Sequence, residues 1–236
     1  QYLMLTIEQI KEAESLSAAE AIRLVTEWFP QGVVFSSSLG QEDQVLTDMI
    51  YKNGLPVKIF TIDTGRLFNE TYELLDRTNA RYKNNMQVYF PESADVESFV
   101  QEKGINAFYE SVENRKECCF LRKVKPLNRA LAGAKVWITG LRAEQSDNRQ
   151  DMPLIEWDEQ RQLYKFNPLI NWTYEQMMTY IAEHNVPYNA LHDKGFISIG
   201  CAPCTRAIEA GEHPRAGRWW WESSQKECGL HGEHKK

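Results

Sequence analysis

Strand-sized apolar segments alternate with helical segments along the first two-thirds of this 236-residue chain, and this alternation restricts the possible folds more than any other feature. Short apolar runs predict strands at 32–35, 57–62, 86–90 and 135–139. Segments with apolar residues at helical spacing flank these strands, the clearest being 6–29, 41–51 and 67–79. Such alternation is typical of an α/β fold with a parallel sheet covered by helices on both faces.

The last third of the chain follows a different pattern. Two short runs at 154–157 and 163–166 predict a hairpin, and Thr173 with Gln176 forms a capping-box pattern that predicts the start of a helix. From Gly195 onward the chain is rich in Gly, Pro and charged residues and lacks periodicity. We expect irregular structure there, held by something other than a core.

These patterns predict two parts of the chain. Residues 1–218 form a single α/β domain in this interpretation, and residues 219–236 form a mobile C-terminal tail. For the run Trp219, Trp220 and Trp221, core packing is the expectation.

Composition narrows the class of protein further. The chain has 27 Lys and Arg against 33 Asp and Glu, a net charge of -6, which disfavours nucleic acids and anionic membranes as partners. No apolar run reaches the roughly 18 residues that a membrane span needs, and no signal pattern opens the chain. We therefore expect a soluble, cytoplasmic protein.

Two loops are candidate ligand sites because they follow predicted strands. In parallel sheets, ligands bind at the carboxyl ends of strands, where helix N-termini offer N–H groups to anions. The loops are 36–41, which contains Ser36, Ser38 and Gly40, and 63–66, which begins with Asp63. Taken alone, either loop is better explained by ordinary turn and cap residues.

The cysteines carry the strongest chemical signal. Four of the five stand in two pairs: Cys118 with Cys119, and Cys201 with Cys204. Four thiolates are typical ligands of zinc or of an iron–sulfur cluster, and spacing alone leaves these two alternatives open. The fifth, Cys228, lies in a polar tail beside Lys226 and His231, which favours a reactive nucleophile over an incidental surface thiol.

A basic run surrounds the first cysteine pair. Between Arg115 and Arg142 there are eight basic residues and one acidic residue, a local charge of +7 in an acidic chain. Such a compact run favours a small, multiply charged anion as the ligand.

Four motifs together resemble those of the assimilatory adenylyl-sulfate reductases. They are Cys118-Cys119-x-x-Arg122-Lys123, Thr139-Gly140-Leu141-Arg142, Gly200-Cys201-Ala202-Pro203-Cys204 and Glu227-Cys228-Gly229-Leu230-His231. The likeness covers nearly the whole chain. It implies a fold similar to the ATP pyrophosphatases, an adenine-nucleotide alpha-hydrolase-like domain with a parallel sheet.

The resemblance also implies roles for individual residues. Cys228 would be the nucleophile, and a [4Fe-4S] cluster would be held by Cys118, Cys119, Cys201 and Cys204. The substrate-contacting basic residues would be Lys123, Arg142, Arg149, Arg215, Arg218 and His231. The serine-rich loop replaces the Ser-Gly-Gly-x-Asp-Ser loop of the pyrophosphatases, so Ser36, Ser38 and Gly40 would cradle a phosphosulfate, and Asp63 would lie near the nucleotide.

The activity implied by the resemblance is reduction of adenylyl sulfate to sulfite and AMP in sulfate assimilation. A thiosulfonate on Cys228 would be resolved by thioredoxin or a similar dithiol protein.

Three alternatives to this activity stay open. The first is 3'-phosphoadenylyl sulfate as the substrate, alone or beside adenylyl sulfate, although reductases of this family that are restricted to it generally lack the two cysteine pairs. The second is a zinc-stabilised nucleotide-binding module without reductase activity. The third, an ATP-dependent RNA thiolation enzyme, is disfavoured by the altered loop and the acidic charge. The sequence leaves homo-oligomerisation open.

Overall fold

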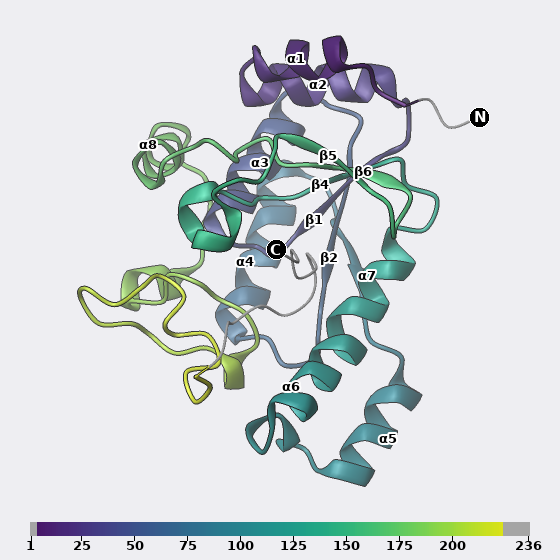
Figure 1. Ribbon diagram of the computed structural model, residues 1–236. Helices are drawn as coiled ribbons and strands as arrows, with labels where there is room; N and C mark the ends of the chain where they lie inside the picture. The colour runs from purple at the N-terminus through teal and green to yellow at the C-terminus, as the bar shows by residue number, and fades with distance from the viewer. Residues whose placement is uncertain (1–3, 224–236) are drawn as a thin grey trace. The chain divides into compact units, whose positions relative to one another are not determined.

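The computed structural model describes residues 4–223, which form a mixed α/β fold with mostly parallel strand pairing (Figure 1). The described residues fall into two compact units. The first unit comprises 4–37, 41–59 and 133–187, and the second comprises 38–40, 60–132 and 188–223. The predicted division at residue 218 stays a prediction, and most of the predicted tail lies outside the described residues.

The first unit contains four strands in the order β1-β4-β6-β5. Their bounds are β1 (Val33–Ser37), β4 (Val136–Ile138), β5 (Ile155–Asp158) and β6 (Leu163–Phe166). β4 pairs in parallel with β1 and with β6, whereas β5 and β6 run antiparallel and confirm the predicted hairpin. Phe35, Ile138 and Phe166 are fully buried, as strands covered on both faces require.

The helices of the first unit are α1 (Ile7–Glu14), α2 (Ala18–Trp28), α3 (Gln41–Lys52) and α8 (Tyr174–His184), with the short 3-10 helices η3 (Ala143–Gln145) and η4 (Asp147–Arg149). The single helical segment expected over 6–29 is wrong in one respect, because the chain breaks between α1 and α2. Ser17 and Glu20 form a capping box that begins α2. The capping box predicted for Thr173 and Gln176 is confirmed at the start of α8.

The second unit contains most of β2 (Lys58–Ile62), which pairs in parallel with β3 (Gln87–Tyr89). Its helices are α4 (Asn69–Tyr82), α5 (Ser93–Lys103), η1 (Ala107–Tyr109), α6 (Val112–Cys119), η2 (Phe120–Val124), α7 (Lys125–Ala130), η5 (Ala190–Lys194) and η6 (Ala202–Cys204). From Gly195 to Ser223 the chain is irregular apart from η6, as predicted. Within residues 4–223, no helix has the length and apolar character needed to cross a membrane.

One stretch of the second unit departs from ordinary helix geometry. α6, η2 and α7 follow one another without interruption, and the five residues of η2 form a π-helix (Figure 1). Segments of this kind are rare and frequently occur at functional sites. Here η2 begins directly after Cys118 and Cys119 and carries Arg122 and Lys123.

Candidate active site

Two cysteine pairs meet in the second unit, and we call them the cysteine cluster: Cys118, Cys119, Cys201 and Cys204. One member of each pair is buried beside Phe108 and Trp219, and the other two pack against the same group. The first pair ends α6, whereas the second flanks η6, a turn in which Cys204 N donates to Cys201 O at 3.1 Å. Two short helical segments far apart in sequence therefore bring the predicted ligand set together.

Thr64 links the cysteine cluster to the loop after β2. Its Oγ1 lies 3.1 Å from Cys201 Sγ and accepts a hydrogen bond from Arg66 N at 3.2 Å. Its carbonyl oxygen accepts a hydrogen bond from Arg122 Nη1 at 2.6 Å. Sequence reasoning missed Thr64, which looks like an ordinary turn residue, and did not assign a role to Arg122 although it belongs to the Cys-Cys-x-x-Arg-Lys motif.

Burial favours the neutral form of two thiols of the cysteine cluster, Cys118 and Cys204. It raises the pKa of Cys118, while Arg122 acts in the opposite direction. It also raises the pKa of Cys204 to about 12, an effect that Cys201 reinforces and that Lys123 opposes. Thiols in such surroundings become thiolates at neutral pH only when a cation binds them.

The donor chemistry fits a thiolate-bound metal centre. Four thiols lie in one largely buried cluster, none of them in a disulfide, and basic side chains nearby offset the negative charge that ligation would create. Among residues 4–223, no three His, Cys, Asp or Glu side chains converge closely enough to bind a metal ion. A metal centre at the cysteine cluster therefore stays a prediction.

Trp219 is the aromatic centre of this region. It is 1% exposed, and the guanidinium groups of Arg115 and Arg218 lie over its ring at 4.5 and 4.9 Å from the centroid. Arg115 forms a two-pronged ion pair with Glu222, with Nε–Oε1 and Nη2–Oε2 distances of 2.9 and 2.7 Å. Core packing is thus confirmed for Trp219, whereas the neighbouring Trp220 is 39% exposed.

Arg218 occupies a closely fitted position. Its side chain is buried, and Nη1 donates to Ser198 Oγ at 3.2 Å. A Cβ atom on Gly200 would approach Nη2 of Arg218 to 2.4 Å, so only glycine leaves room for this guanidinium. The structure thereby explains the glycine of the Gly-Cys-Ala-Pro-Cys motif. Lys123 and Arg215 are both half-buried in the same unit.

The basic run of the sequence is not one open patch. Several of its members form ion pairs with acidic residues from distant segments: Arg115 with Glu222, Lys125 with Asp95, Arg129 with Glu92 and Arg142 with Glu42. A charge count along the sequence cannot show these pairs. The positive charges that act on the cysteine cluster include those of Arg122, Lys123 and Arg218.

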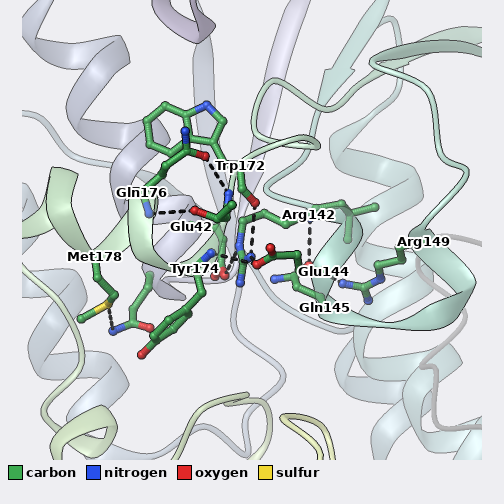
Figure 2. Close-up of polar contacts among 12 residues, drawn as sticks. Glu42, Arg142, Glu144, Gln145, Arg149, Trp172, Tyr174, Gln176 and Met178 are labelled. Atoms are coloured by element: carbon green, nitrogen blue, oxygen red, sulfur yellow. Dashed lines mark hydrogen bonds and ion pairs between the residues drawn. The ribbon is translucent and has the colours of Figure 1, made fainter.

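In the first unit, Arg142 lies between two carboxylates (Figure 2). Its Nε donates to Glu42 Oε1 at 2.9 Å, and its Nη1 lies 3.3 Å from Glu144 Oε2 and 3.4 Å from Trp172 O. Glu144 Oε2 also accepts a hydrogen bond from Tyr174 N at the start of α8. Arg142 thus connects α3, η3 and α8, and its predicted contact with substrate stays a prediction.

The motif that precedes Arg142 depends on close packing. Gly140 lies so near α3 that a Cβ atom there would approach Asp43 Oδ1 to 1.8 Å. The hydroxyl of Thr139 accepts a hydrogen bond from Leu141 N at 3.4 Å. The Thr-Gly-Leu-Arg sequence therefore sets the turn that delivers Arg142 to its carboxylate partners.

Arg149 is buried in the same unit and is held by an amide. Its Nη1 donates to Gln145 Oε1 at 2.6 Å, and the same oxygen accepts a hydrogen bond from Arg142 N at 3.0 Å.

Lys165 on β6 is only 3% exposed. Burial lowers the pKa of Lys165 to about 8, against the influence of Glu156, and Arg149 lowers it further. Sequence reasoning missed both Gln145 and Lys165.

The predicted phosphosulfate loop precedes α3, whose N-terminus is suited to anions. Ser36 lies in the first unit, where its Oγ accepts a hydrogen bond from Trp137 Nε1 at 2.7 Å. Ser38 and Gly40 belong to the second unit, and Ser38 Oγ accepts a hydrogen bond from Gly40 N at 3.3 Å. The positive φ of Leu39, +61°, makes the tight turn between them.

Asp63 stabilises its own loop. Its Oδ1 accepts hydrogen bonds from Gly65 N and from the Tyr72 hydroxyl, both at 2.7 Å. Burial raises the pKa of Tyr72 to about 12, with a further contribution from Asp63. The proximity of Asp63 to a nucleotide stays a prediction.

The predicted nucleophile Cys228 and the predicted substrate contact His231 lie outside the described residues.

The family model for the phosphoadenosine phosphosulfate reductase domain matches residues 32–207. The chain belongs to this family. Among its curated relatives, the adenosine 5'-phosphosulfate reductase of Allochromatium vinosum is 51% identical over 84% of this chain and 78% of the relative. The enzyme of the same name from Rhizobium meliloti is 51% identical over 92% of this chain and 82% of the relative.

Solved structures agree with the assignment to the reductase family. The phosphoadenylyl-sulfate reductase of Candida auris, in a phosphate complex, has a TM-score of 0.74 and 32% identity, and the match covers 87% of this chain and all of that chain. NMN synthetase from Francisella tularensis, at a TM-score of 0.52 and 12% identity, shares the fold alone, with 77% of this chain and 73% of that chain covered. These neighbours confirm the predicted α/β fold class.

The family match spans both cysteine pairs and Arg149 and ends before Arg215 and Arg218. The proposed roles of residues after 207 are therefore supported by the described geometry and by the sequence motifs, and not by the family match.

Proposed function

We propose that this protein is an adenylyl-sulfate reductase, which converts adenylyl sulfate to sulfite and AMP in sulfate assimilation. The observation that carries the proposal is the cysteine cluster with Lys123 and Arg218 beside it, in a chain 51% identical to proteins named adenosine 5'-phosphosulfate reductase. The phosphoadenylyl-sulfate reductase of Candida auris is less similar, at 32% identity, which favours the substrate without the 3'-phosphate.

In the proposed reaction, the thiolate of Cys228 attacks the sulfur atom of the sulfate group. A bond forms between Cys228 Sγ and that sulfur, the bond from sulfur to the bridging oxygen breaks, and AMP leaves with the electron pair. AMP is a good leaving group, so no general acid is needed. The product is a thiosulfonate on Cys228.

A dithiol protein such as thioredoxin would complete the turnover. One thiolate attacks Cys228 Sγ and forms a mixed disulfide, and the sulfur–sulfur bond of the thiosulfonate breaks to release sulfite. The second thiol then displaces Cys228 and closes the disulfide of the partner. The two electrons that reduce the sulfur therefore come from the dithiol.

Both the attacking thiolate and the substrate are anions, so they repel each other. Basic side chains offset this repulsion. We propose that Lys123, Arg215, Arg218 and His231, together with Arg142 and Arg149, bind the sulfate and phosphate groups. Fixed positive charges in a partly buried site stabilise the developing charge on the leaving phosphate without reorganisation. Arg218 is well suited to this role because Gly200 and Ser198 hold its guanidinium in one place.

The cysteine cluster would hold a [4Fe-4S] group through Cys118, Cys119, Cys201 and Cys204. Once bound, that group would order the segments that carry Lys123 and Arg206 and would set the local charge. Lys123 and Arg218 lower the pKa of Cys204, so these cations favour the thiolate forms that ligation needs.

Mass spectrometry of the purified protein, incubated with adenylyl sulfate in the absence of any reductant, tests the function. We expect one added SO3 group on Cys228, and release of sulfite when thioredoxin or dithiothreitol is added. The Cys228→Ser variant should bind substrate yet gain no mass. Full turnover by Cys228→Ser would remove the proposed nucleophile, and failure of the unmodified protein to bind or convert adenylyl sulfate would overturn the function itself.

The same preparation separates the zinc-binding module from the reductase. A brown protein with broad absorbance in the blue region and with bound iron and sulfide favours the reductase. A colourless, zinc-loaded protein without turnover favours the module.

A further inference from the structure

The buried hydroxyl of Thr205 holds the start of the Gly-Cys-Ala-Pro-Cys turn. Thr205 directly follows Cys204 and is 5% exposed. Its Oγ1 donates to Cys201 O at 2.9 Å and accepts a hydrogen bond from Gly200 N at 3.1 Å. A single side chain therefore uses both its donor and an acceptor to fix the backbone of Gly200 and Cys201.

The backbone of Thr205 faces the segment that carries Arg218. Thr205 and Arg218 form an antiparallel β-bridge. Beside this bridge, Trp219 N donates to Cys204 O at 3.0 Å. The segment with Arg218 is thus aligned directly against the segment with Thr205.

Gly200 connects the hydroxyl of Thr205 to the guanidinium of Arg218. A Cβ atom on Gly200 would approach Arg218 Nη2 to 2.4 Å, so the backbone at Gly200 packs directly against the guanidinium. On the same guanidinium, Nη1 donates to Ser198 Oγ at 3.2 Å. A shift of Gly200 would therefore change the space that Arg218 occupies, and Thr205 prevents this shift by accepting the hydrogen bond of Gly200 N.

The charge of Arg218 has no acidic partner within residues 4–223. Its contacts there include the hydroxyl of Ser198 and the ring of Trp219, but no carboxylate. The side chain is 7% exposed, and its Nε has no hydrogen-bond partner in this part of the chain. A buried donor without a partner is unfavourable, and an anionic ligand at the guanidinium would supply one.

We propose that Thr205 is a positioning residue, which holds the guanidinium of Arg218 where it binds an anionic group of adenylyl sulfate. This inference rests on the proposed function, because the substrate anion is the ligand of Arg218 there. The hydroxyl of Thr205 is used by two backbone groups, so Thr205 acts through Gly200 and Arg218 and not by contact with substrate.

The decisive variant is Thr205→Val. Valine keeps the β-branched shape but lacks the hydroxyl, so Gly200 N and Cys201 O lose their shared partner. Adenylyl sulfate should bind about tenfold or more weakly, as expected when a charged hydrogen bond to the ligand is lost. Thr205→Ser keeps the hydroxyl and should bind within about threefold of the unmodified protein, because the same two hydrogen bonds can form.

A double-mutant cycle tests whether Thr205 acts through Arg218. In the Arg218→Met background the guanidinium is absent, so Thr205→Val should weaken binding by less than a further factor of about two. A general disturbance of the fold or of the cysteine cluster would instead weaken binding in both backgrounds. Unchanged binding of adenylyl sulfate by Arg218→Met alone would overturn the inference.

Thr78→Val is the matched control, because it also removes a buried hydroxyl from the second unit. The Oγ1 of Thr78 donates to Leu74 O at 2.7 Å within α4, which carries none of the predicted substrate contacts. The lost hydrogen bond should lower the melting temperature, whereas the dissociation constant of adenylyl sulfate should change less than about twofold.

Calorimetric titration with adenylyl sulfate, combined with thermal unfolding, gives the result. Weaker binding by Thr205→Val, recovery in Thr205→Ser and no further loss in the Arg218→Met background support the inference. Equal dissociation constants for Thr205→Val and the unmodified protein, or an equal loss in both backgrounds, overturn it and leave the proposed function intact. Failure of the unmodified protein to bind adenylyl sulfate overturns the proposed function and, with it, the role of Thr205. If Thr205→Val does not fold, Thr205→Ala takes its place in the cycle and is judged by the same outcomes.

Discussion

The cysteine cluster of the second unit and the arginine network of the first, formed by Glu42, Arg142, Glu144, Gln145 and Arg149, manage buried charge in opposite ways. In the cysteine cluster, burial raises the pKa of Cys118 and Cys204, so the thiols stay neutral. In the arginine network, the guanidinium groups cannot lose their protons, and the chain supplies acceptors for them.

This difference indicates how each region would respond to a bound group. A neutral thiol becomes a thiolate when it ligates a metal, so under the proposed function the cysteine cluster would gain its negative charge only on binding that group. A buried arginine is charged from the moment of folding, so its partners must be built into the chain. The arginine network is therefore expected to carry its positive charge whether or not a ligand is bound.

The largest effect should follow from Cys204→Ser. Replacing a ligand should lower bound iron and sulfide and reduce turnover by more than about a hundredfold, since even indirect partners of metal ligands contribute 10- to 100-fold. Metal analysis and the visible spectrum provide the measurement. The matched control is Cys228→Ser, which should lose turnover but keep its colour. Full iron and sulfide in Cys204→Ser would contradict the assignment.

The next largest effect concerns the ion pairs of the two regions. The Arg115–Glu222 pair has side chains only 1% and 3% exposed, so Glu222→Gln removes the negative charge from a buried ion pair and should cost about 3–5 kcal/mol of unfolding free energy. Arg142 retains Glu144 and a carbonyl when Glu42 is changed, so Glu42→Gln should cost about 1–3 kcal/mol.

Urea denaturation of both variants measures this order directly. Glu92→Gln is the control, because its ion pair with Arg129 is exposed and should contribute about 0–1 kcal/mol. A larger loss for Glu42→Gln than for Glu222→Gln would reverse the comparison between the two regions.

The last effect is a pH dependence from Lys165, which is largest near neutral pH and disappears in base. Its pKa is about 8 in the folded chain against 10.5 ordinarily, so the unfolded chain binds the proton more tightly between these values. The unfavourable contribution of Lys165 is fully present below pH 8 and disappears as the pH rises through 10.5. Lys165→Met should therefore be more stable at pH 7 by up to about 3 kcal/mol, with the difference vanishing near pH 10.5. If the difference in unfolding free energy between Lys165→Met and the unmodified protein is constant from pH 7 to 10.5, it does not come from the lowered pKa of Lys165.

Much of the fold is predictable from the sequence because its signals are local. The hairpin of β5 and β6 and the capping box of α8 both depend on residues close together in the chain. The break between α1 and α2 is also local, at Ser17 and Glu20, yet the apolar spacing across it continues and conceals it.

The candidate site is less predictable because its contacts are distant in sequence. Motifs pointed to the cysteines, and the family resemblance pointed to Arg149, but Thr64 touches Cys201 from a loop that has no metal-ligand pattern. Likewise, the run of basic residues along the chain does not show that Arg115 meets Glu222. The partner of a buried charge depends on tertiary packing, which a run of similar residues does not encode.

The π-helix η2 has a consequence for the spacing of the family motif. A regular α-helix turns about 100° per residue, so the extra residue of a π-helical turn offsets the directions of the side chains on either side of it. Shortening Phe120–Val124 by one residue would restore regular winding and rotate Arg122 and Lys123 relative to Cys118 and Cys119 by about that angle. The two residues between the cysteine pair and Arg122 thus fit a π-helical turn. A change in their number would have to be accompanied by a change in the helix type.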